Sequence, residues 1–115
     1  MAVHSSRADV EKVLNDMRDA LQHKKFFFAR RLKNMDTLSA LGILISDVRD
    51  ELLNLSFSDY ISGPEVDYDL PKSDRLWIFK RNVSGQVIYI KFKVEYQTDG
   101  KVKVISFHLD ERPDQ

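Results

Sequence analysis

Apolar residues recur three, four and seven positions apart along the first part of the chain. They are Val10, Val13, Leu14, Met17 and Leu21. A helix would carry all five on one face, which is the pattern of a helix that packs against a core. Ser6 and Asp9, three residues apart, resemble a capping box in which Asp replaces the usual Glu. The pattern predicts a first helix over Arg7 to Gln22.

The middle of the chain combines a strand pattern with two helix patterns. Lys25 to Arg31 is short and rich in Phe, which is typical of a strand. Asp36 to Leu41 predicts a short helix that ends at Gly42, because glycine readily adopts the left-handed conformation of a helix C-terminus. Ser46 is the expected N-cap of another helix, which continues to Leu55.

The segment Ser56 to Asp74 contains strong breakers of regular structure. Gly63-Pro64 and Pro71 interrupt it, and five of its nineteen residues are acidic. Clusters of this kind mark turns and loops. We expect a long surface loop here.

Two turn motifs organise the last third of the chain into strands. Asp99-Gly100 favours a two-residue hairpin loop, and Ser84-Gly85 favours a second one. The expected strands are Arg75 to Asn82, Gln86 to Tyr96 and Lys101 to Leu109. They predict an antiparallel meander.

Counting outward from Asp99-Gly100 places Lys91 opposite His108 and Phe92 opposite Phe107. Since side chains alternate between the faces of a sheet, one face is expected to be apolar. Its residues are Ile90, Phe92, Val94, Ile105, Phe107 and Leu109. The other face is expected to carry Tyr89, Lys91, Lys93, Glu95, Val104, Ser106 and His108. The Ser84-Gly85 loop pairs Phe79 with Ile90, Trp77 with Phe92 and Lys80 with Tyr89.

These elements predict one α+β domain over residues 1–115, with the N-terminal helices packed on one face of a small antiparallel sheet. The sequence has no Cys and 43% hydrophobic residues. No apolar run approaches the roughly 20 residues of a membrane span, and no secretory signal is expected at the N-terminus. We therefore expect a cytoplasmic protein that has no disulfides or thiolate metal sites and does not associate with a membrane.

The formal net charge is zero, but two segments are basic. Lys24 to Lys33 has five Lys or Arg and no acid, and Arg75 to His108 has seven Lys or Arg against two acids. Such segments favour a local anion-binding face. The alternative is that these cations only solvate strands and sheet edges.

The polar face of the meander offers candidate chemistry. Opposed residues on adjacent strands have Cβ atoms about 4.5 to 5.5 Å apart, so Lys91 and His108 would act on one substrate group. Lys80 and Tyr89 join them as candidate catalytic residues, and an ordinary solvated sheet face remains the alternative. No pattern with metal-ligand spacing and no glycine loop for a nucleotide is found, so no metal and no cofactor are expected.

Several short segments occur in an order that resembles the MqsR-type toxins of type II toxin–antitoxin systems. The resemblance covers most of the chain. The segments are Leu41-Gly42, Leu52-Leu53-Asn54-Leu55, Ser58-Asp59-Tyr60, Trp77, Gly85 to Lys91, and Ile105-Ser106-Phe107.

This resemblance implies a RelE-like fold and a metal-independent endoribonuclease. Tyr89 matches the family's strand tyrosine, although one extra residue separates it from the Gly-Gln pair. Three positions depart from the family: its lysine after the Asp-aromatic pair falls at or near Ser62, its glutamine after the tryptophan at Ile78, and its final lysine at His108. The cleavage motif and the detailed mechanism therefore stay open.

The expected function is cleavage of mRNA by a growth-inhibiting toxin that a cognate antitoxin protein neutralises. His108 would transfer protons, Lys91 and Lys80 would stabilise charge, and Tyr89 would orient phosphate or stack on a base. The expected RNA-binding residues are Arg30, Arg31, Lys33, Arg81 and Lys93. Two alternatives remain, a nucleic-acid-binding module without catalysis and a small immunity or anti-restriction protein. The sequence does not indicate ribosome association.

Overall fold

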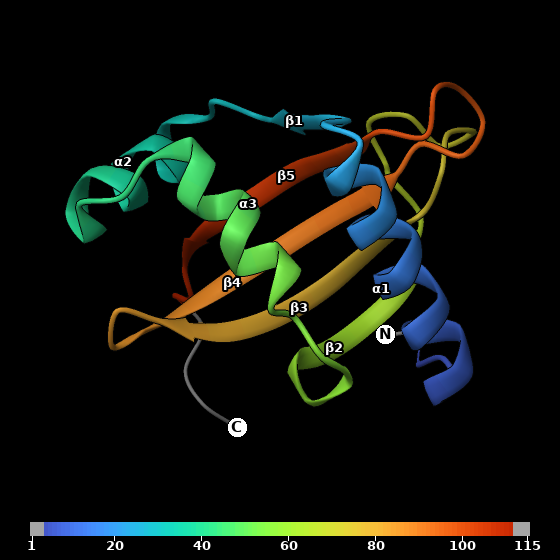
Figure 1. Ribbon diagram of the computed structural model, residues 1–115, viewed down its shortest axis with the longest axis horizontal. Coiled ribbons are helices and arrows are strands. Elements are labelled where there is room, and N and C mark those ends of the chain that lie inside the picture. The colour runs from blue at the N-terminus through green and yellow to red at the C-terminus, as the bar shows by residue number, and fades with distance from the viewer. Residues whose placement is uncertain (1–3, 112–115) are drawn as a thin grey trace.

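A computed structural model describes residues 4–111. Residues 1–3 and 112–115 lie outside this range. The ends of the domain expected over 1–115 and the first three residues of the N-terminal segment, where no secretory signal is expected, are therefore outside the described residues. Within it, five strands form one mixed sheet, shown in Figure 1. The strands are β1 (Phe26–Phe28), β2 (Tyr60–Glu65), β3 (Leu76–Val83), β4 (Gln86–Val94) and β5 (Val102–Leu109).

The strand order is β1-β5-β4-β3-β2, and β1 runs parallel to β5 while every other pair is antiparallel. The α+β class and the β3–β4–β5 meander are thereby confirmed. The expectation of a wholly antiparallel sheet is wrong. A long connection through two helices and three strands separates β1 from β5, so the chain can return in the same direction, which a short hairpin does not allow.

The helices are α1 (Arg7–Gln22), α2 (Leu32–Leu41) and α3 (Ile45–Leu53), followed by a short 3₁₀ helix, η1 (Phe57–Asp59). The bounds of α1 and its Ser6 cap are confirmed, since the Asp9 amide donates to the Ser6 hydroxyl at 3.2 Å. Gly42 ends α2 with φ of 68° as expected. No helix within residues 4–111 is long and apolar enough to cross a membrane.

Two helix starts differ from the expectation. Helix α2 begins at Leu32 rather than Asp36. The N-cap position of α3 is Leu44 and not Ser46, and the Leu44 amide donates to the Asp47 carboxylate at 2.7 Å. An aspartate three residues after the cap position satisfies a backbone donor that has no partner within the helix, so a capping side chain at Ser46 is not needed.

The expected long loop over Ser56 to Asp74 is wrong in its first half, which forms η1 and the edge strand β2. Gly63-Pro64 lies inside β2, where proline is tolerated because one side of an edge strand has no ladder to complete. Gly63 has φ of 126°, and a Cβ there would lie 2.8 Å from the Leu76 carbonyl oxygen. Glycine therefore allows β2 to approach β3 closely. Residues 66–75 remain a loop.

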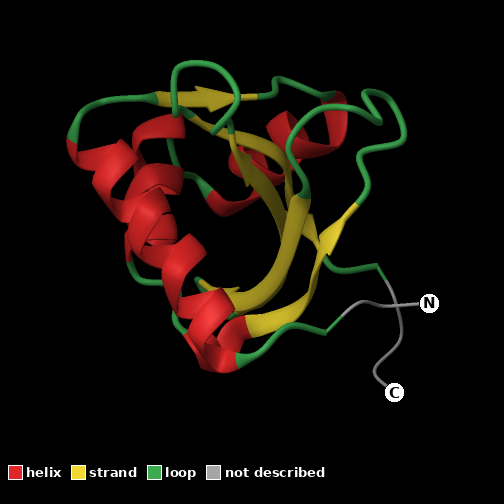
Figure 2. Cartoon of the chain, turned by 90° about the vertical axis from the view of Figure 1, so that its right-hand side faces the viewer, coloured by secondary structure: helices red, strands yellow, loops and turns green. Residues whose placement is uncertain are grey.

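Helices α1 and α3 cover one face of the sheet (Figure 1), and this face is the concave one (Figure 2). Helix α2 packs beside β5. The core between the helices and the sheet includes Leu14 and Met17 from α1, Leu52 from α3, and the stacked rings of Phe79 and Phe92 from the sheet. The side chains on this face of the sheet are therefore buried in the core. The opposite face of the sheet is the one that polar side chains reach.

The β3–β4 register is confirmed residue by residue. Trp77 pairs with Phe92, Phe79 with Ile90, and Lys80 with Tyr89. Ser84 and Gly85 both have positive φ, 53° and 84°, as a two-residue type I′ hairpin turn requires.

The predicted β4–β5 register is wrong. Asp99-Gly100 is part of a longer loop that the Glu95 amide closes by donating to the Lys101 carbonyl at 2.9 Å, and Val94 therefore pairs with Val102 rather than Ile105. A bulge in β5 next to Lys91 and Phe92 then changes the offset, so that Ile90 pairs with Phe107. The predicted faces consequently hold for Ser106 to His108.

Val104 and Ile105 exchange faces relative to the prediction. Val104 pairs with Phe92 and belongs to the core, whereas Ile105 lines a hollow on the opposite face. Asn34 of α2 stabilises the bulge that causes this exchange. Its amide group donates to the Ile105 carbonyl at 3.0 Å and its side-chain oxygen accepts from the Phe107 amide at 3.0 Å.

Candidate functional site

The candidate site lies on the face of the sheet that α1 and α3 do not cover. Two cross-strand rows meet there. In one row Lys80 pairs with Tyr89 and Tyr89 with His108. The expected Lys91–His108 pair is therefore wrong, because the longer hairpin loop and the bulge together shift β5 by two residues at this point.

The second row joins four strands. Ser62 of β2 pairs with Ile78, Ile78 with Lys91, and Lys91 with Ser106. Because residues that pair directly share a face, the two rows lie side by side on one surface. This face thus contains all four positions that the family resemblance singles out, namely Ser62, Ile78, Tyr89 and His108, although the side chains of Ser62 and Ile78 are buried.

The His108 ring has one nitrogen engaged in the backbone and stacks on an aromatic ring. Its Nδ1 lies 2.9 Å from the Leu109 carbonyl oxygen. Since a carbonyl oxygen only accepts, Nδ1 carries the proton, and the neutral ring then has its lone pair on Nε2. The rings of Tyr89 and His108 are nearly parallel, at 22°, with centroids 5.3 Å apart. These two contacts hold the ring in one orientation and leave Nε2 as its second nitrogen.

Lys91 supplies a positive charge next to this stack. It is half-buried, and its amine has no hydrogen bond or ion pair with the residues in the described range. As the diagonal neighbour of His108, it lies about 7 to 8 Å away at the level of the backbone, within reach of a long side chain. Lys91 and His108 are therefore brought together, although not as direct partners.

Lys80 is part of an ion pair that the sequence analysis did not anticipate. Its amine lies 2.6 Å from the carboxylate of Asp110, whose side chain is only 4% exposed. Asp110 follows β5, and its amide donates to the Val87 carbonyl at 3.0 Å. Because no motif surrounds Asp110, only the tertiary structure identifies it. The pair reduces the net charge that Lys80 offers to a ligand.

A hollow of about 270 Å³ borders the Tyr89–His108 stack. Lys33, from the first turn of α2, also lines it, together with Asp110 and Glu111. Lys33 forms an ion pair with Glu111 at 3.3 Å, but both side chains are 63% exposed, so the pair is weak and exchangeable. The structure thus brings Lys33 from the first basic segment to the histidine of the second.

Arg30 and Arg31 lie beyond Lys33, in the connection between β1 and α2. Both are exposed. Arg31 approaches Asp69 at 3.9 Å, and Arg30 has no hydrogen-bond or ion-pair partner among residues 4–111. Both side chains are therefore accessible to a ligand, and their expected role in RNA binding stays a prediction.

Lys93 lies on the same face but is not accessible. Its side chain is fully buried and its amine lies 3.0 Å from both the Asp67 carboxylate and the Ser73 hydroxyl. Burial raises the pKa of the Asp67 carboxyl, but the hydrogen bond from Lys93 and those from the backbone outweigh burial, so the net pKa is lowered. Lys93 thus attaches loop 66–75 to the sheet, and its expected role in surface RNA binding is wrong.

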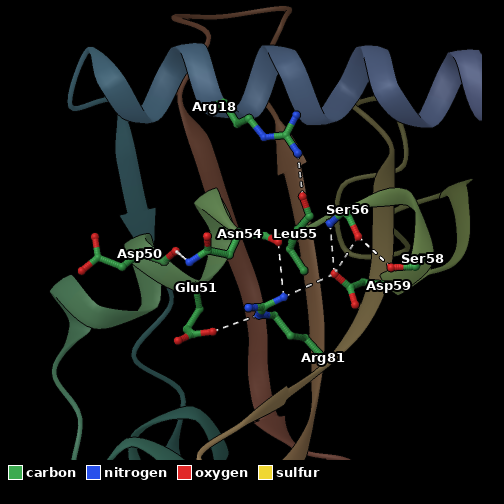
Figure 3. A network of polar contacts seen from close by, with 9 residues as sticks. All are labelled: Arg18, Asp50, Glu51, Asn54, Leu55, Ser56, Ser58, Asp59 and Arg81. Carbon is green, nitrogen blue, oxygen red and sulfur yellow. Dashed lines mark hydrogen bonds and ion pairs between the residues drawn. The ribbon is translucent and has the colours of Figure 1, made fainter.

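Arg81 lies on the helical side of the sheet, as Figure 3 shows. Its Nε donates to Glu51 at 3.0 Å, its Nη1 donates to the Asn54 carbonyl at 3.3 Å, and Asp59 lies 3.7 Å away. These contacts join β3 to the end of α3 and to η1. The expected RNA-binding role of Arg81 is wrong, because its side chain points away from the candidate site and is held by helix residues.

Within residues 4–111, no group of three or more His, Cys, Asp and Glu side chains is arranged to hold a metal ion. The candidate site therefore comprises Tyr89 and His108 with the cationic residues Lys33, Lys80 and Lys91 around them. No protein-family model matches this chain, and its sequence has no match among the curated proteins.

Proposed function

We propose that the protein is a metal-independent endoribonuclease that cleaves mRNA and acts as a growth-inhibiting toxin, restrained by a cognate antitoxin protein. The observation that carries the proposal is the His108 ring, which is stacked on Tyr89, anchored through Nδ1 and flanked by cations. The ordered resemblance to MqsR-type toxins supports it as well. Its four marked positions share one face of the sheet, although they come from four strands and Ser62 and Ile78 are buried.

The reaction is attack of an RNA 2′-hydroxyl on the adjacent phosphate. His108 Nε2 accepts the 2′-proton, the O2′–P bond forms, and the P–O5′ bond breaks, while the leaving oxygen takes a proton from solvent. Lys91 stabilises the additional negative charge of the transition state, and Tyr89 orients the phosphate or stacks on a base. A RelE-like architecture is part of this proposal.

The deciding experiment incubates the purified protein with single-stranded RNA in excess EDTA and maps the product ends. We expect 2′,3′-cyclic phosphate and 5′-hydroxyl ends, and no cleavage at a site that carries a 2′-deoxy substitution. His23→Ala is a matched control, because His23 Nδ1 also lies 2.8 Å from a carbonyl oxygen but His23 is at the end of α1. It should cleave at the wild-type rate.

Two other outcomes would replace the proposal. RNA binding without any cleavage would favour a nucleic-acid-binding module, since a stacked Tyr–His pair among cations can also bind a nucleic-acid base without catalysing a reaction. Neither binding nor cleavage would favour a protein-interaction role such as immunity or anti-restriction. If the protein is such a toxin, a short gene next to its own should encode the antitoxin, and expression with and without this neighbouring gene tests the toxin assignment in cells. We expect growth arrest without the neighbour and its relief by co-expression.

A further inference from the structure

A second hollow, of about 330 Å³, lies on the same face at the β1–β5 edge of the sheet. Phe27, Arg30, Arg31 and Lys103 contribute to its lining, and loop 66–75 forms one wall through Asp67, Asp69 and Leu70. It is separate from the hollow beside His108, since the two share no lining residue. No residue of the candidate site around Tyr89 and His108 lines it.

Phe27 is an exposed aromatic side chain at this edge. Its neighbours Phe26 and Phe28 pack against or within the core, whereas Phe27 is 47% exposed. It pairs with Lys103 of β5, whose amine lies 5.7 Å from the centre of its ring. An exposed ring next to cations is the arrangement by which proteins stack a base of single-stranded nucleic acid while binding its phosphates.

The charge around this ring is positive overall. Arg30 and Lys103 have no carboxylate partner among the described residues. Of the two acids of the wall, Asp67 is paired with buried Lys93, and Asp69 makes only a weak, exposed contact of 3.9 Å with Arg31. The cations in the lining, Arg30, Arg31 and Lys103, still outnumber these acids. The net positive charge of the hollow therefore favours binding of a polyanion.

Two segments of the chain lead from this hollow to the candidate site. Lys103 and His108 lie on the same strand and the same face, separated by about 15 Å at the usual rise of a β-strand. Arg30 and Lys33 lie on one short stretch of chain that connects the two hollows. An extended single strand of RNA with one nucleotide at His108 would reach Phe27 a few nucleotides away.

We infer that Phe27, Arg30 and Lys103 form a second subsite for single-stranded RNA, in which the ring stacks on a base and the two cations bind phosphates. This inference rests on the proposed function. The subsite binds substrate at a distance from the reacting phosphate. It therefore increases affinity for RNA long enough to span both hollows and adds nothing for a fragment that occupies only the His108 hollow.

The experiment measures binding of 2′-O-methyl RNA oligonucleotides, which cannot be cleaved, by fluorescence anisotropy. A dinucleotide, which is too short to span both hollows, and a decanucleotide are compared for the wild type, Phe27→Leu and Lys103→Gln. We expect each variant to bind the decanucleotide about tenfold more weakly and the dinucleotide as the wild type does. Phe27→Trp should bind the decanucleotide at least as well as the wild type. Thermal unfolding checks that each variant is folded.

Arg7→Gln is the matched control, because Arg7 is an exposed cation 5.0 Å from the centre of the Phe57 ring, on the helical side of the sheet. It should leave both affinities unchanged. Wild-type affinity of the folded Phe27→Leu and Lys103→Gln variants for the decanucleotide would overturn the subsite and leave the proposed function intact.

Loss of binding to the protein encoded by the neighbouring gene, with RNA affinity unchanged, would instead assign this hollow to protein docking and overturn the inference. If the wild type binds neither oligonucleotide, the subsite and the proposed function both fail.

Discussion

At the scale of single residues, the proposed reaction depends on Nε2 of His108. We expect His108→Ala to lower the single-turnover cleavage rate by about 10²- to 10⁴-fold and to change RNA affinity far less, because proton transfer acts in the transition state. Lys91→Ala should weaken both rate and affinity, since a cation near phosphate also binds the ground state. Rate and anisotropy measurements on the same preparations separate the two effects.

The His108→Ala variant should remain folded, because a half-buried position on the polar face affects stability by only about 0.5 kcal/mol. Cleavage at the wild-type rate by this folded variant would remove His108 from the catalytic role. Tyr89 and Lys80 would then be the next candidates.

The Asp67–Lys93 pair predicts a specific dependence of stability on pH. Asp67→Asn should destabilise the protein by about 3 kcal/mol at pH 7, because it leaves the buried Lys93 charge without its counter-ion. The folded-state pKa of Asp67 is lowered. Its contribution is therefore complete above the unfolded pKa of about 4 and is lost as pH falls through the folded value.

The difference in free energy of unfolding between the wild type and Asp67→Asn should accordingly shrink below about pH 4. Urea titrations at a series of pH values measure it. Asp69→Asn is the control, since the Asp69 side chain is 86% exposed, and it should behave as the wild type. A difference that stays constant down to the lowest pH would contradict the assignment of this pair.

At the scale of elements, α2 determines the local geometry of β5. Asn34 is 1% exposed and its side chain joins the Ala29 carbonyl, the Ile105 carbonyl and the Phe107 amide. Asn34→Ala should destabilise the protein by about 3 kcal/mol, because it leaves buried backbone groups without partners. It should also increase hydrogen exchange at the Phe107 amide, which NMR can follow.

The matched control is Ser39→Ala, an exposed position on the same helix. Equal stability of Asn34→Ala and Ser39→Ala would show that the bulge forms without α2. Because the bulge sets the offset at which His108 meets Tyr89, we also expect the cleavage rate of Asn34→Ala to fall.

At the scale of the whole molecule, the two sides of the sheet differ in whether the cations of the basic segments are paired with acids. Arg81 is neutralised on the helical side, while Arg30, Lys33, Lys91 and Lys103 remain on or beside the polar face. If these four bind phosphates, the affinity for single-stranded RNA should fall about fiftyfold between 50 and 200 mM salt. Anisotropy titrations in increasing salt measure the slope of the logarithm of affinity against the logarithm of salt concentration.

Each cation removed from the face should reduce the slope by about 0.7. Arg7→Gln, on the helical side, should leave it unchanged. An affinity that is insensitive to salt would contradict a phosphate-binding face of any extent.

The sequence alone determined the features that depend on neighbouring residues. Helix α1 follows from its apolar spacing and its Ser6 cap, the end of α2 from Gly42, and the β3–β4 register from Ser84-Gly85. In each case the interactions that select the conformation are within a few residues, so local patterns contain the necessary information.

Tertiary structure decided the remaining features because distant groups select them. The β4–β5 loop is held by Tyr96, which donates to Asp16 of α1, and by the Gln97 amide, which donates to Asp74. The longer loop and the bulge in β5 together make Tyr89 the partner of His108, whereas the turn motif predicted Lys91.

The burial of Lys93 and the place of Arg81 were likewise decided by carboxylates far away in the chain, in loop 66–75 and in α3. Strand positions alone indicate on which face a lysine lies. Whether its charge is available to a ligand depends on which acid the fold brings close to it.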